Sequence, residues 1–140
     1  MSEEHIFQAH EDEEAMTYLI ELFLTAKTEL LIADKYLDQT ILDMLEWTPA
    51  SVKVRLLTGP SRTKSGFANL LRDHGQSNVA CRIDETGLFE KYVVIDNAHL
   101  YILSVSFNAI GKQGITIEKL EDAEMVATLK KLWSNATQLR

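Results

Sequence analysis

The chain alternates short apolar runs with amphipathic segments over its first two thirds. Residues 30–33 form a continuous run of Leu, Ile and Ala, which is typical of a strand buried on both faces. Elsewhere, apolar residues recur every three or four positions, as they do on the buried face of a helix. The pattern predicts strands over residues 30–33, 52–58 and 79–83, and helices over residues 12–27, 38–47 and 63–74. Strands that alternate with helices predict a mostly parallel sheet with helices on both faces.

The last third of the chain follows a different pattern. Three strand-like segments are predicted over residues 91–95, 100–105 and 115–117, and a final amphipathic helix over residues 122–136. Asp96-Asn97-Ala98 is a short turn sequence, so the first two of these strands should form a hairpin. Together the two parts predict one mixed, mostly parallel α/β domain over residues 1–140, with its core over residues 28–136.

The composition indicates a folded domain that does not bind polyanions over a broad surface. Of the 140 residues, 46% are hydrophobic, which is enough for a core. The formal net charge of −7 argues against broad contact with DNA or anionic lipid, because such contact needs a basic face. The N-terminus lacks the apolar run of a signal peptide, and no apolar stretch is long enough to span a bilayer. We therefore expect a cytoplasmic protein that does not bind membranes.

The single cysteine, Cys81, cannot form a disulfide within the chain, which fits a reducing compartment. Cys81 lies in a strand-like run, where a small buried side chain is expected rather than a reactive thiol. No paired Cys or His spacing for zinc is present, and no glycine-rich phosphate loop follows the first strand. The sequence thus predicts neither a metal nor a cofactor.

Candidate chemistry gathers on the predicted hairpin. Side chains alternate across a strand, so Phe89 and Lys91 should share one direction, and Ser104 and Ser106 should share one on the neighbouring strand. Together with Asn108, the lysine and the two hydroxyls would suit a phosphate or carboxylate ligand. In the alternative interpretation, Lys91 is a surface charge and the serines are polar residues at a strand end.

A second polar group, Asp34, Tyr36 and Asp38, follows the first predicted strand, where α/β sheets commonly bind ligands. Asp38 would alternatively cap the helix that comes after it. A structural role is open to Asp96 as well, because Asp followed by Asn is common in turns.

Residues 30–133, about three-quarters of the chain, resemble the phospholipase D-like superfamily. The resemblance rests on the order and spacing of several segments. These are the strands over 31–38 and 52–58, Lys91 followed after four residues by Asp96, the serine–asparagine turn over 104–108, the segment 115–122, and Leu132-Trp133 near the end. The superfamily signature begins with a histidine two residues before its lysine, and Phe89 stands in that position.

The resemblance implies a mechanism that needs this histidine. In the superfamily, two signatures meet across a pseudo-twofold axis, and lysines and asparagines hold the phosphate oxygens. One histidine forms a phosphohistidine and the other protonates the leaving group. A single signature copy implies a homodimer. Phe89 would remove both roles at once, because a benzyl group can neither attack phosphorus nor carry a proton. Ser106 also stands near the position usually given to asparagine.

We therefore expect a non-catalytic, homodimeric binding or recruitment module that contacts a protein partner. Its vestigial anion pocket would consist of Lys91, Ser104, Ser106 and Asn108. Two alternatives stay open. One is a phosphodiesterase or nuclease that uses another base, such as His99, or a partner subunit with an intact signature. The other is a nucleic-acid-binding accessory domain, which the acidic charge disfavours; its basic patch would comprise Lys53, Arg55, Arg62, Lys64 and Arg72.

Overall fold

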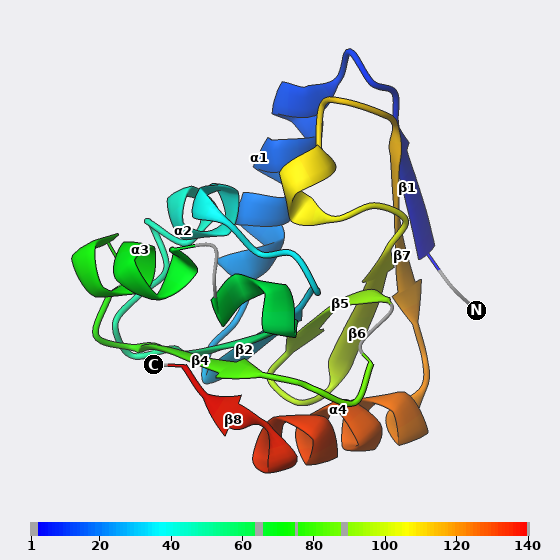
Figure 1. Cartoon of the computed structure of the whole chain (residues 1–140). Helices are drawn as coiled ribbons and strands as arrows, with labels where there is room; N and C mark the ends of the chain where they lie inside the picture. Colours follow the sequence, from blue (N-terminus) through cyan, green and yellow to red (C-terminus); the bar gives the residue numbers. More distant parts are fainter. Residues whose placement is uncertain (1–2, 64–65, 75, 88–89, 140) are drawn as a thin grey trace.

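The computed structural model describes residues 3–63, 66–74, 76–87 and 90–139. Within these ranges, eight strands form one sheet with helices on both sides (Figure 1). In chain order the elements are β1 (Glu3–Phe7), α1 (Asp12–Phe23), β2 (Glu29–Ala33), α2 (Gln39–Met44), β3 (Lys53–Thr58), the 3-10 helix η1 (Pro60–Thr63), α3 (Phe67–His74), β4 (Val79–Ile83), β5 (Lys91–Ile95), β6 (His99–Leu103), the 3-10 helix η2 (Phe107–Ala109), β7 (Ile115–Leu120), α4 (Ala123–Asn135) and β8 (Thr137–Gln138).

The strands of the sheet lie in the order β1-β7-β6-β5-β2-β3-β4-β8. Pairing is parallel for β2–β3 and β3–β4, and antiparallel for the other neighbouring pairs of described strands. The predicted mixed α/β sheet with helices on both faces is confirmed, but its parallel part is smaller than expected. The reason is that β5 and β6 form the predicted antiparallel hairpin, and β5 also pairs with β2 in the antiparallel direction.

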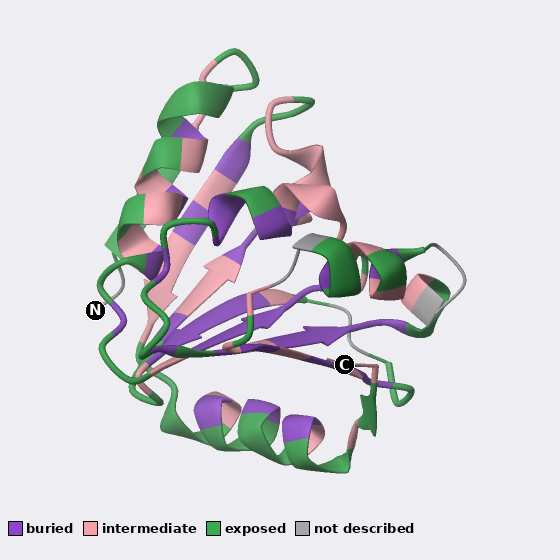
Figure 2. Ribbon diagram, turned by 90° about the vertical axis from the view of Figure 1, so that its left-hand side faces the viewer, coloured by how far each residue is buried: buried purple, intermediate pink, exposed green. Residues whose placement is uncertain are grey.

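Each face of the sheet carries its own apolar layer. Helices α1, α2 and α3 cover one face, where Phe23, Ile41 and Leu71 belong to a common core. Helix α4 covers the other face through Leu129 and Trp133. Figure 2 shows the central strands buried between these layers. Because β2 lies in the middle of the sheet, it is buried from its second residue to its last, which accounts for its continuous apolar run.

The sequence did not predict β1 and β8. Strand β1 lies at the edge of the sheet and is exposed over most of its length, so it lacks an alternating apolar pattern. Strand β8 is only two residues long and pairs with the end of β4. Helix α1 is shorter than predicted, because the amides of Lys27 and Thr28 donate to Asp96 instead of continuing the helix. The predicted cap is confirmed: Asp38 accepts a 3.0 Å hydrogen bond from the Thr40 amide at the start of α2.

Candidate functional site

A cavity of about 370 Å³ opens at the end of the sheet where β2 ends and β5 begins. It is lined by Asp34, Lys35, Tyr36, Lys91, Ser104, Val105, Ser106, Ala109 and Gln113. The fold thus brings together Lys91, Ser104 and Ser106, three of the four residues predicted to hold an anion. That they bind an anion stays a prediction. Asn108 does not line the cavity; its side-chain amide donates to the Tyr36 carbonyl at 3.2 Å.

Asp34 forms part of the cavity wall and is fully buried. Its Oδ1 accepts a hydrogen bond from the Tyr36 amide at 2.9 Å. Its Oδ2 accepts one from the Ser106 hydroxyl at 2.6 Å and another from the Phe107 amide at 2.9 Å. These donors offset the desolvation of a buried carboxylate, which is strongly destabilising when it has no partner. Asp34 therefore ties the end of β2 to η2.

The two serine hydroxyls differ in what they can offer a ligand. The Ser106 hydroxyl donates its only hydrogen bond to Asp34, so towards a ligand its oxygen can act only as an acceptor. Ser104 accepts a hydrogen bond from the Thr116 amide at 2.8 Å, which leaves its own proton able to donate. Of the two, Ser104 is therefore the better donor to an anion.

Two lysines bring positive charge to the cavity, Lys91 from the first residue of β5 and Lys35 from the connection between β2 and α2. Among the described residues, no carboxylate lies within 4.0 Å of the Lys91 ammonium. Gly59 packs closely on Lys35. Its amide donates to the Lys35 carbonyl at 3.1 Å, and a Cβ at position 59 would lie 2.6 Å from Lys35 Cγ and 2.9 Å from Lys35 O. Glycine therefore permits the approach that positions Lys35.

Of the vestigial signature Phe89, Lys91 and Asp96, the two described residues lie at opposite ends of β5. Phe89 lies outside the described residues. Asp96 follows the opposite end of β5, in a turn where its φ is 54°. Its carboxylate accepts hydrogen bonds of 2.8–3.1 Å from the amides of Lys27, Thr28 and Glu29. The Thr28 and Glu29 amides, joined by that of Lys27 and the Thr28 hydroxyl, hold the pKa of Asp96 well below its usual value. Asp96 thus has a structural role.

His99, proposed as an alternative base, is placed too far from the cavity to act there. His99 pairs with Ile95 across the hairpin, whereas Lys91 pairs with Leu103. The two ends of β5 are roughly 13 Å apart at the usual rise per residue. His99 lies instead beside Asp96, at a separate hollow. His99 is therefore not placed to act as a base in this cavity, and no histidine or cysteine is among the described residues that line it.

Among the described residues of the suggested basic patch, Lys53 and Arg55 share one side of β3, and Arg62 lies beyond the other end of that strand. Arg55 forms an ion pair with Glu29 at 2.6 Å and faces the ring of Trp133 on the α4 side of the sheet. Arg62 follows the opposite end of β3 from Lys53 and donates to the Leu37 carbonyl. Lys64 lies outside the described residues. The described residues of the patch are thus divided between the two ends of β3, which offers less to a nucleic acid than one continuous basic face.

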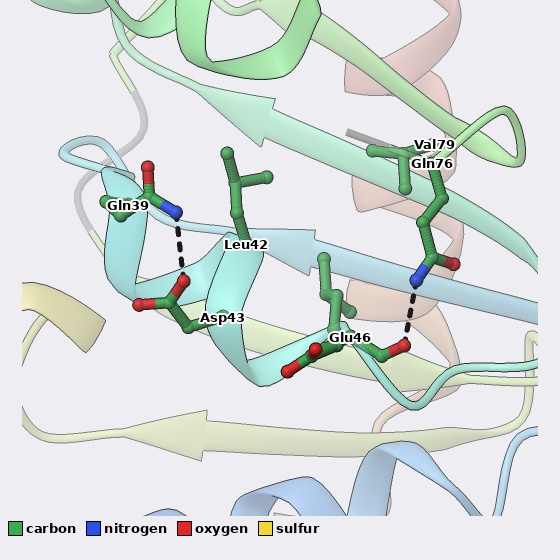
Figure 3. Close-up of a pocket in the computed structure, with 7 residues that line it drawn as sticks. Gln39, Leu42, Asp43, Glu46, Gln76 and Val79 are labelled. Atoms are coloured by element: carbon green, nitrogen blue, oxygen red, sulfur yellow. Dashed lines mark hydrogen bonds between the residues drawn. The ribbon is translucent and has the colours of Figure 1, made fainter. Parts of the chain in front are cut away.

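A second cavity, of about 210 Å³, lies beside α2 (Figure 3). Two side-chain amides in its lining donate hydrogen bonds. Gln39 donates to the Asp43 carboxylate at 2.9 Å, and Gln76 donates to the Glu46 carbonyl at 2.8 Å. The charged groups of this cavity are carboxylates, so it does not suit an anion. The cavity at Lys91 is therefore the better candidate site.

Neither thiol chemistry nor a metal centre is evident in the described part of the chain. Cys81 is buried, and burial raises the pKa of its thiol to about 12. No three His, Cys, Asp or Glu side chains there are arranged to hold a metal ion. No helix in the same ranges has the length and apolar character needed to cross a membrane.

The sequence matches no family model and no curated protein. The fold does match solved structures. Nuc from Salmonella typhimurium, a phospholipase D family member, aligns over 99% of this chain and 98% of its own, with 12% identity and a TM-score of 0.71. NucT from Helicobacter pylori aligns over 99% of each chain, with 15% identity and a TM-score of 0.65. Phosphatidylserine synthase from Haemophilus influenzae aligns over 98% of this chain and 39% of its own, with 13% identity and a TM-score of 0.69. The protein therefore has the same fold as these structures, among them a phospholipase D family member.

Proposed function

We propose that the protein is a non-catalytic, homodimeric binding module whose cavity at Lys91 holds a phosphate or carboxylate group of its ligand. The observation that carries this proposal is the joint position of Lys91, Lys35 and Ser104 on one cavity wall. The two ammonium groups supply charge, and the Ser104 hydroxyl supplies a donor for which the described residues show no acceptor. Lys91 is only partly buried, so a small anion should bind with a Kd on the order of millimolar.

The described residues of the same cavity do not include the groups on which the signature mechanism depends. Phe89 occupies the signature position of the nucleophile in the sequence, and the described lining contains no histidine. Ser106 is held by Asp34, but a serine needs a base that takes up its proton and later returns it to the leaving group. Asp34 is fully buried and already accepts three hydrogen bonds within the protein, so its contacts are those of a structural group. Binding without turnover is the outcome that this arrangement favours.

Dimerisation is the part of the proposal that comes from the single signature copy. A large aromatic residue at the cavity supports it: Tyr36 is 43% exposed although it lines the site. Exposed tyrosines are enriched where proteins meet. A second copy placed against this mouth would cover Tyr36 and enclose the anion between two Lys91 side chains.

The anion site can be tested by titrating inorganic phosphate and acetate into the protein and following backbone amide shifts by NMR. The Lys91→Met variant should bind about tenfold more weakly, because it loses one of two cations. Lys130→Met is the matched control, since Lys130 is exposed on α4 and lies outside the cavity lining. Equal affinity of the wild type and Lys91→Met would exclude the site.

Two further measurements separate this function from its alternatives. Incubation with bis-p-nitrophenyl phosphate and with single-stranded DNA should give no hydrolysis above buffer. Turnover that disappears in Ser106→Ala would establish a phosphodiesterase or nuclease in place of a binding module. Sedimentation at micromolar concentration should give the mass of a dimer, and a monomer alone would remove the dimer from the proposal.

A further inference from the structure

One edge of the sheet is open at β1. In the described part of the chain β1 pairs with β7 on one side, and no strand lies on its other side (Figure 1). Its residues are exposed except for the partly exposed Phe7 at its end. Backbone N–H and C=O groups along such an edge can pair with an additional strand. The edge is therefore a place where an extended segment can add to the sheet.

A groove of about 450 Å³ runs beside this edge, between β1 and α1. Its lining consists of Phe7, Glu13, Glu14, Thr17, Tyr18 and Glu21. The rings of Phe7 and Tyr18 are 5.7 Å apart and inclined at 48°, and they form the apolar part of the groove. Glu14, Tyr18 and Glu21 follow at helical spacing, so they share one side of α1. Phe7 belongs to β1 itself, so the open edge and the groove are continuous.

The groove is negatively charged. Glu13, Glu14 and Glu21 are exposed, and within the described ranges none has a Lys, Arg or His nitrogen within 4.0 Å. Burial, with the neighbouring Tyr101 and Glu3, raises the pKa of the Tyr18 phenol. An ammonium or guanidinium group would meet carboxylates and aromatic faces together, and both attract a cation.

We propose that β1 and this groove bind an extended basic segment of a partner protein. The segment pairs with the free edge of β1 and places a lysine or arginine side chain between Phe7, Tyr18 and the three glutamates. A second copy of this chain is a poor occupant, because pairing two β1 strands in the antiparallel direction would bring Glu3 and Glu4 of one copy towards the acidic groove at Phe7 of the other. The groove shares no lining residue with the cavity at Lys91, so this surface is independent of the anion site.

The test uses the full chain and an N-acetylated hexapeptide in which threonine and lysine alternate. Calorimetry gives the affinity, and amide hydrogen exchange shows where the peptide lies. We expect the lysine peptide to bind and to slow exchange in β1. We expect the same peptide with glutamate in place of lysine not to bind. The triple variant Glu13→Gln, Glu14→Gln, Glu21→Gln should bind the lysine peptide about tenfold more weakly.

The matched control is Glu46→Gln, Glu85→Gln, Glu124→Gln, which removes the same charge from exposed positions outside the groove. It should keep the wild-type affinity within about twofold, since distant surface charges are screened. An equal loss in both triple variants would attribute binding to net charge and overturn the proposal. Binding of the glutamate peptide, or protection of amides elsewhere without β1, would overturn it as well.

Discussion

Asp96 connects two parts of the chain that are far apart in sequence. Replacing it should show how much this connection contributes to the free energy of unfolding. Its carboxylate accepts hydrogen bonds from the amides of Lys27, Thr28 and Glu29 and from the Thr28 hydroxyl. Hydrogen bonds to charged groups each contribute about 1.5 kcal/mol or more when buried, and less where water competes. Because these bonds are solvent-accessible, their loss should lower the free energy of unfolding by about 2 kcal/mol in total.

Three variants separate the hydrogen bonds from the backbone strain. Asp96 has a φ of 54°, which glycine adopts freely and alanine does not. Asp96→Gly should therefore lose about 2 kcal/mol, and Asp96→Ala about 3 kcal/mol because left-handed backbone adds roughly 1 kcal/mol. Asp96→Asn tolerates the φ and keeps one acceptor oxygen, so it should lose about 1 kcal/mol. Urea unfolding followed by circular dichroism gives these free energies.

The pH dependence supplies an independent check on the charge. The folded protein holds the pKa of Asp96 below the unfolded value of about 3.9. The stabilisation by its carboxylate is therefore fully present well above that value and is lost as the pH falls below it towards the folded pKa. Wild type should lose more stability than Asp96→Asn over this acid range. An Asp96→Gly variant as stable as wild type, or equal acid sensitivity in Asp96→Asn, would refute the reasoning.

Three other predictions concern the candidate site. Gly59→Ala should displace Lys35 and lower the free energy of unfolding by about 2 kcal/mol, because the alanine Cβ would lie 2.9 Å from the backbone oxygen of Lys35. An unchanged free energy of unfolding together with unchanged amide shifts at Lys35 would contradict this prediction. Asp34→Ala should lower the free energy of unfolding by about 3 kcal/mol and Ser106→Ala by about 1 kcal/mol, since only the first leaves buried donors without an acceptor. Urea unfolding of both variants tests whether Asp34→Ala is the less stable one. Phe89→His restores the signature spacing but should give at most slow hydrolysis of bis-p-nitrophenyl phosphate, because Ser106 stands near the position of a phosphate-holding asparagine and its hydroxyl already donates to Asp34. Turnover above about 1 per second, a rate within the usual enzyme range, would contradict this prediction.

Local patterns predicted most of this fold, because they depend on neighbours in sequence. The hairpin after Lys91 follows from two apolar segments and a three-residue turn, and the cap at Asp38 from an aspartate before a helical pattern. The open edge at β1 was missed for the same reason. Only one residue of that strand, Phe7, escapes full exposure, so no alternation marks it.

The site was predictable only in part. Lys91 and Ser104 line the same cavity because the hairpin register places Lys91 opposite Leu103, the residue directly before Ser104. The contact from Asp34 to Ser106 spans 72 positions, and no local pattern encodes it. An aspartate directly after a fully buried strand was the available signal, since such a carboxylate must find donors. Asn108 was placed in the pocket by spacing alone, but its amide is taken up by the Tyr36 carbonyl.

The pairing of β2 with β5 also affects how the protein is made. Strand β2 is central, yet one of its two neighbours is synthesised some sixty residues later. During translation, the edge of β2 that later pairs with β5 stays unpaired in the β2-α2-β3-α3-β4 portion until β5 emerges from the ribosome. Such a nascent intermediate is prone to aggregation and is a natural client for chaperones. The domain is thus indivisible, and neither half made alone should fold.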